Sequence, residues 1–128
     1  MKVGDVVPPL EHKLELLDLV AYAGATWDWY RTHYDPVAVA EQKLPAALVD
    51  GQMLGALLAQ HAMNWAGPRG FIRKMSFRFK GMVFAGDTVR CEGEVTAVDG
   101  GVITLQQRVM VSERVAVDPA MLELELRP

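Results

Sequence analysis

The chain has 128 residues, of which 51% are hydrophobic and 23% charged, and its formal net charge is −3. This length predicts one domain, residues 1–128, with a single core. The weakly acidic balance argues against nucleic acid as a partner, because a phosphate-binding surface needs a basic face. The one cysteine, Cys91, excludes an internal disulfide, and its alternating surroundings predict a packed core thiol.

Membrane association is not expected either. No apolar run approaches the roughly 20 residues that a membrane-spanning helix needs, and no charged-then-apolar leader opens the chain. We therefore expect a cytoplasmic protein.

The first part of the chain predicts a short strand, two helices and an aromatic loop. After an extended start, residues 12–16 alternate as in a strand. Residues 16–24 place apolar side chains at helical spacing, with Gly24 as the expected stop. The segment WDWYRTHYDP, residues 27–36, is expected to be a loop that ends in a turn, and a short helix at 36–43 follows it.

Residues 51–67 form the most apolar segment and predict a helix that ends at Gly67-Pro68. Apolar side chains lie almost all round this helix, so it must be buried on most sides. Everything after it reads as long alternating strands, at 71–79, 87–98, 102–111 and 115–126. This order predicts an α+β protein of the hotdog fold, an antiparallel sheet wrapped around one helix. Its two exposed sheet edges favour a dimer.

The aromatic loop and the helix before it carry a family resemblance. YAGATWDWYRTHYD, residues 22–35, resembles the signature of MaoC-like hydratases and dehydratases, which runs roughly Y-A-G-A-S-G-D-x-N-P-x-H-x-D. The matching residues are Tyr22, Ala23, Gly24, Ala25, Asp28, His33 and Asp35. Residues 49–53, VDGQM, correspond to the family's A-H-G-M-L start of the central helix. The resemblance extends from about residue 13 to the last strand.

The chain also departs from the family pattern. Trp27 stands for the usual Gly, Trp29-Tyr30 for Asn-Pro, and Asp50 for the His of many members. These changes are similar to those of a divergent subgroup of short subunits, some of which act on bulky acyl-CoA substrates such as steroid side chains. In that subgroup a short chain can pair with a second MaoC-like chain that lacks the catalytic pair.

The resemblance implies an (R)-specific enoyl-CoA hydratase or 3-hydroxyacyl dehydratase whose catalytic pair is Asp28 and His33. Five positions apart on a straight helix, these side chains would point about 140° away from each other, so they can grip one water molecule only if the segment between them is a loop. The enolate oxygen would be stabilised by the backbone amide of Gly51, at the start of the central helix. No cofactor is expected, because CoA is part of the substrate.

Further residues are candidates for substrate binding, and each has a simpler explanation. Asp50 is a good helix cap and is expected to cap rather than to take part in the chemistry. A basic cluster could bind CoA phosphates, although a solvated strand face is the default; its members are Arg69, Arg73, Lys74, Arg78 and Lys80. The predicted substrate-binding residues are Trp29, Tyr30, Asp50, Gln52, Arg73 and Lys74. The three histidines, His12, His33 and His61, show no metal-ligand spacing, so no metal is expected.

Two other functions remain open at this point. The same fold supports an acyl-CoA thioesterase with Asp50 as its carboxylate, and a non-catalytic subunit of a heteromeric hydratase would belong to a different class. Retention of both Asp28 and His33 argues against each of them. The chain is expected to act on an acyl-CoA thioester, as a homodimer or in a heteromer with a second MaoC-like chain.

Overall fold

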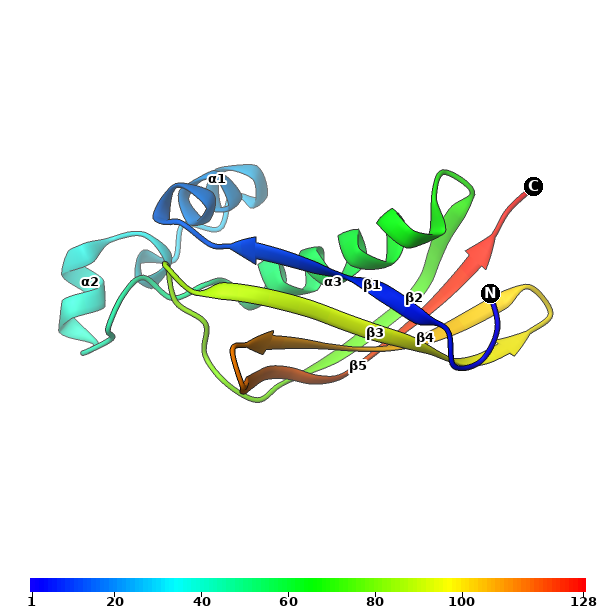
Figure 1. Cartoon of the computed structure of the whole chain (residues 1–128). Coiled ribbons are helices and arrows are strands. Elements are labelled where there is room, and N and C mark those ends of the chain that lie inside the picture. The colour runs from blue at the N-terminus through cyan, green and yellow to red at the C-terminus, as the bar shows by residue number, and fades with distance from the viewer.

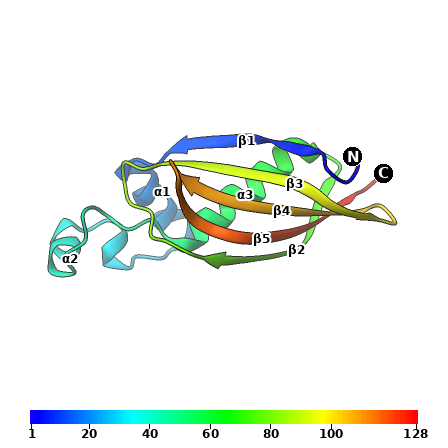
Figure 2. The same cartoon turned by 60° about the horizontal axis from the view of Figure 1, so that its bottom comes forward.

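The computed structural model describes all residues from 1 to 128. It contains one antiparallel sheet of five strands in the order β1-β3-β4-β5-β2. The strands are β1 (Val6–Lys13), β2 (Gly70–Phe79), β3 (Thr88–Asp99), β4 (Val102–Val111) and β5 (Arg114–Leu126). The helices are α1 (Leu16–Thr26), α2 (Pro36–Glu41), α3 (Gly51–Ala66) and the 3-10 turn η1 (Arg31–His33). Figures 1 and 2 show α3 lying along one face of the sheet, with α1 and α2 gathered at one end of the molecule.

The core lies between α3 and the face of the sheet that curls around it. Leu58, near the middle of α3, has no exposed surface, and neither do Leu105 and Val109 of β4, which packs beneath. The exposed positions of α3 recur every four residues at Gln52, Ala56, Gln60 and Asn64, and they form a narrow exposed stripe. The predicted hotdog arrangement of one nearly buried helix inside an antiparallel sheet is therefore confirmed.

Two predicted boundaries are wrong at the start of the chain. The strand expected at 12–16 instead begins within the extended start: β1 runs from Val6 to Lys13, its register shifts between Val7 and Leu10, and Leu16 already starts α1. Pro8 and Pro9 occupy that irregularity, where a residue without an N–H group costs no ladder hydrogen bond. Helix α1 also continues beyond Gly24 to Thr26, and Trp27 ends it in the left-handed conformation with φ 57°.

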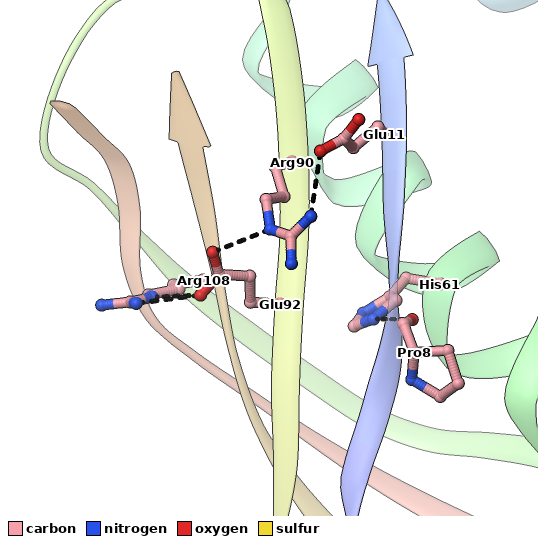
Figure 3. A network of polar contacts seen from close by, with 6 residues as sticks. All are labelled: Pro8, Glu11, His61, Arg90, Glu92 and Arg108. Atoms are coloured by element: carbon pink, nitrogen blue, oxygen red, sulfur yellow. Dashed lines mark hydrogen bonds and ion pairs between the residues drawn. The ribbon is translucent and has the colours of Figure 1, made fainter. Parts of the chain in front are cut away.

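A buried histidine joins α3 to the edge strand β1. The Nε2–H of His61 donates to the carbonyl oxygen of Pro8 at 2.9 Å, and Nδ1 accepts from the side-chain amide of Gln107 at 3.0 Å. This assignment follows because the Pro8 carbonyl oxygen can only accept a hydrogen bond. The His61 ring therefore stays neutral, and its burial lowers the pKa from the ordinary value of 6.5. Figure 3 shows the ring reaching from α3 to Pro8 on β1.

This histidine predicts how stability depends on pH. Because the pKa of His61 is lower in the folded chain, the unfolded chain binds a proton there below about pH 6.5, whereas the folded chain binds it only at a lower pH. The free energy of unfolding should therefore fall with decreasing pH, by at most about 1.4 kcal/mol per pH unit from this group. Urea unfolding between pH 5.5 and 7.5 measures the slope. The His61→Gln variant, which keeps a donor and cannot titrate, should have a flatter slope, and an unchanged slope would contradict the assignment.

The opposite face of the sheet carries a chain of surface ion pairs across three strands. Arg90 of β3 contacts Glu11 of β1 at 2.9 Å and Glu92 of β3 at 3.1 Å, and Glu92 also accepts from Arg108 of β4 at 2.8 Å (Figure 3). Exposed pairs of this kind contribute little stability individually. Cys91, between them, points the other way: it is buried, as predicted, and burial raises the pKa of its thiol to about 12. None of the helices is both long enough and apolar enough to cross a bilayer.

Candidate active site

The end of α1 sets the position of Asp28. The N–H groups of Trp27 and Asp28 both donate to the carbonyl oxygen of Ala23, so the chain turns sharply out of the helix. Asp28 Oδ1 then accepts a 3.4 Å hydrogen bond from the N–H of Tyr30. The expectation that Asp28 and His33 are separated by non-α-helical chain is confirmed, and the loop finishes in the 3-10 turn η1.

His33 is held by the backbone of the segment that leads into α3. The N–H of Leu48 donates to the carbonyl oxygen of Thr32 at 2.9 Å, and His33 Nδ1 lies 2.6 Å from the carbonyl oxygen of Leu48. Because a carbonyl oxygen only accepts, Nδ1 carries the proton and Nε2 of the neutral ring keeps a free lone pair. The fold thus fixes the tautomer that a general base requires.

Asp50 completes the cluster from the other side. Its Oδ1 accepts from Gln52 N–H at 3.0 Å and caps α3, as expected. Oxygens of Asp28 and Asp50 and a ring nitrogen of His33 all lie within 4.8 Å of one another. They border a small, narrow hollow. Its lining residues are Leu19, Tyr22, Ala23, Asp28, His33, Asp50 and Met53.

The two carboxyl groups have shifted pKa values of opposite sign. A hydrogen bond with the Asp50 side chain lowers the pKa of Asp28, and the N–H of Tyr30 lowers it further. Burial raises the pKa of Asp50, and the hydrogen bond with Asp28 adds to that shift. Burial also raises the pKa of Tyr22, and the negative charges of Asp50 and Asp28 raise it further. One proton is therefore held more readily on Asp50 than on Asp28.

The first turn of α3 places Gly51 beside Asp50, where its amide lacks an acceptor within the helix. The absence of a side chain there has a packing reason that the sequence did not indicate. A Cβ atom on Gly51 would lie 2.5 Å from Cζ of Phe79, and one on Gly55 would lie 2.6 Å from Cζ of Phe77. These two glycines, one turn apart, form a notch for the Phe77 and Phe79 rings. The notch brings β2 close to the start of α3.

The other predicted binding residues fall into two groups. Trp29 and Tyr30 border the site without lining the hollow: the Trp29 ring packs on Gly24, and the Tyr30 ring stands edge-on to His33 with centroids 5.6 Å apart. Gln52 is exposed on the first turn of α3. Arg73 and Lys74 are not brought to the catalytic pair, since Lys74 is five strand positions, roughly 17 Å, from Phe79.

Arg73 also contacts Glu125, with Nε and Oε2 3.8 Å apart. Arg78 and Lys80, which flank Phe79, are the members of the basic cluster nearer to Gly51 along the strand. Sequence reasoning did not single them out, because a linear cluster gives no indication of which end faces the site.

Three further features of the site were missed. The Leu48 carbonyl that fixes His33 is a backbone group and leaves no trace in a sequence. Contact between Asp28 and Asp50 depends on tertiary structure. Asp28, His33 and Asp50 together also offer two carboxylates and one imidazole as a possible ligand set for a cation, although the spacing of the histidines gave no such indication.

The fold and this acid–base cluster define a hotdog protein with a candidate active site at the start of its central helix. Residues 4–117 match the family described as MaoC like domain, and the chain belongs to that family. It is 33% identical over 104 residues, 81% of each protein, to the 3-oxo-4,17-pregnadiene-20-carboxyl-CoA hydratase beta subunit of Mycobacterium tuberculosis.

Solved structures give the same picture. A chain in the crystal structure of the ChsH1-ChsH2 complex from Mycobacterium tuberculosis has a TM-score of 0.92 and 31% identity, with 98% of each chain covered. The (R)-hydratase from A. caviae involved in PHA biosynthesis has a TM-score of 0.90 and 26% identity, with coverage of 98% of this chain and 97% of that one. Hydratases are thus prominent among the relatives of this chain.

Proposed function

We propose that this protein adds water reversibly across the 2,3 double bond of an enoyl-CoA thioester. The observation that carries the proposal is the convergence of Asp28 and His33, five residues apart, on one small hollow at the start of α3. A half-buried carboxylate and an imidazole with a free Nε2 are the groups needed to bind and deprotonate one water molecule.

The chemistry assigns each group a step. Nε2 of His33 removes a proton from the water as the water oxygen bonds to C3 of the enoyl group, and Asp28 orients that water. The electron pair of the double bond moves onto the thioester oxygen, where the Gly51 N–H at the positive end of α3 stabilises it. The imidazolium then returns its proton to C2, so the net change is the addition of one water molecule.

The acyl group is proposed to be bulky. Trp27, Trp29 and Tyr30 are 79%, 40% and 58% exposed, an unusual amount of aromatic surface next to a catalytic pair. Large rings at this position suit a wide apolar acyl group rather than a short linear one. The similarity to a subunit of a hydratase named for a steroid-type acyl-CoA supports the same class of substrate. The CoA phosphates would meet the basic residues of β2, including Arg73 and Lys74.

The assembly is proposed to form along the free edge of β2, with a second copy or a second MaoC-like chain. The other edge strand, β1, carries Pro8 and Pro9, which supply no N–H groups for pairing. In contrast, β2 has no proline, none of its residues is buried, and Phe71 and Phe79 are 43% and 53% exposed. Since Phe79 contacts Gly51, a chain added along β2 would lie beside the site.

The test is a hydration assay with crotonyl-CoA and with a steroid-type enoyl-CoA, followed by loss of the enoyl thioester absorbance. It is run on this chain alone and after mixing with each second MaoC-like chain of the same genome. Hydration, faster with the bulky substrate, supports the proposal. Release of free CoA without hydration would favour the thioesterase. If no combination hydrates either substrate, the proposal is wrong.

A further inference from the structure

The first turn of α3 holds the carboxyl group of Asp50 in place. Its Oδ1 accepts the 3.0 Å hydrogen bond from Gln52 N–H, which fixes the orientation of the side chain. A carboxyl group has two oxygens, so one remains for another partner. The side chain is half-buried and borders the same hollow as Asp28 and His33, so groups of the site are within its reach.

Asp28 is positioned to be that partner: oxygens of Asp28 and Asp50 lie within 4.8 Å of each other and of a His33 ring nitrogen. Two ionised carboxylates this close repel each other, and a proton on one of them relieves the repulsion and lets the pair form a hydrogen bond. Asp50 is the better holder, because burial favours its neutral form, whereas Asp28 also accepts from the Tyr30 N–H.

The surroundings contain little that could neutralise a second negative charge. The titratable groups facing Asp50 are Asp28 from the loop, His33 from η1 and Tyr22 from α1. The other residues that line the hollow are apolar: Leu19, Ala23 and Met53. With no Lys or Arg among these residues, repulsion between the carboxylates must be relieved by the shared proton or by His33.

We propose that Asp50 is a positioning residue: it shares one proton with Asp28 and so holds the Asp28 carboxylate toward His33. The inference rests on the proposed hydration. Raising the pH removes the proton, and the two carboxylates then repel each other and Asp28 loses its fixed orientation. An apolar acyl group bound against the pair would exclude solvent from it and favour the form with the proton.

Two variants separate this role from capping. Asp50→Asn still accepts from Gln52 N–H and provides a permanent N–H donor to Asp28. Asp50→Ser keeps the cap with a shorter side chain that does not reach Asp28. We expect wild-type kcat to fall about tenfold per pH unit once the shared proton is lost. The Asn variant should lack this fall, and the Ser variant should be about tenfold slower with an unchanged melting temperature. Identical pH profiles for all three proteins would overturn the proposal.

A titration followed by ¹³C NMR at the Asp side-chain carboxyl carbons does not depend on activity. We expect Asp28 and Asp50 to titrate together in two steps in the wild-type protein. In Asp50→Asn, Asp28 should titrate in a single step. An Asp28 titration that Asp50→Asn leaves unchanged would overturn the inference. Coupled titration in a protein that hydrates no enoyl thioester would support the shared proton and refute the proposed function instead.

Discussion

Replacing His33 by alanine should lower kcat/KM for enoyl-CoA hydration by about 10²–10⁴-fold, because the proposed general base is removed. Asp28→Asn should cause a loss of the same order. The amide keeps the shape of the side chain but has no negative charge and only one acceptor oxygen with which to orient the water. The double variant should be little worse than either single one, because the two groups act on the same water molecule. Initial rates of hydration, measured with one substrate, compare all variants.

His12→Ala is the matched control for these variants. His12 lies on β1, outside the hollow, and its Nε2 is 3.5 Å from Asp18 in an exposed pair, so its removal should leave the rate unchanged. Thermal unfolding checks that the site variants still fold; the lost His33–Leu48 hydrogen bond should cost about 1 kcal/mol. Full activity in folded His33→Ala protein would rule out the assigned base.

The largest stability effect is expected for Leu58→Ala in the middle of α3. Leu58 has no exposed surface and packs within the main core cluster, so the substitution leaves a cavity where the helix meets the sheet. Large-to-small changes of this kind cost about 2–5 kcal/mol, a large part of the 5–15 kcal/mol that stabilises a typical domain. Urea denaturation at fixed protein concentration measures the difference in the free energy of unfolding.

Gln60→Ala, two residues further along α3 on the exposed stripe, serves as the control and should change stability by about 0.5 kcal/mol or less. Similar losses for the two variants would mean that α3 is not buried as described. The hydrogen bond from Gln107 to the Leu58 carbonyl oxygen, 3.0 Å long, involves the backbone, so Leu58→Ala retains it. The measured loss then reports packing alone.

Most of the fold could be predicted because it depends on periodic patterns. Alternation of apolar and polar residues gave β3 and β4 within a residue or two of their bounds, and Gly67-Pro68 ended α3 correctly. The boundary errors occur where one residue overrides the pattern. Trp27 adopts φ 57°, a conformation for which glycine is the usual choice, so Gly24 looked like the better stop.

The site was predictable only in part, because its parts come from different kinds of information. The spacing of Asp28 and His33 lies within one motif, so local sequence suffices to suggest the pair. The contact between Asp28 and Asp50, the Phe79 ring beside Gly51 and the distance of Lys74 from the site all depend on how β2 and α1 pack against α3. No pattern within a single segment encodes such packing.

The bond between His33 and the Leu48 carbonyl has a consequence for how this site can vary. Alanine scanning would overlook Leu48, since exchanging its side chain leaves the acceptor in place. Inserting or deleting one residue between η1 and α3 would instead shift the acceptor and release the imidazole, even if every named side chain were kept. The length of that connection should therefore be constrained more tightly than its composition.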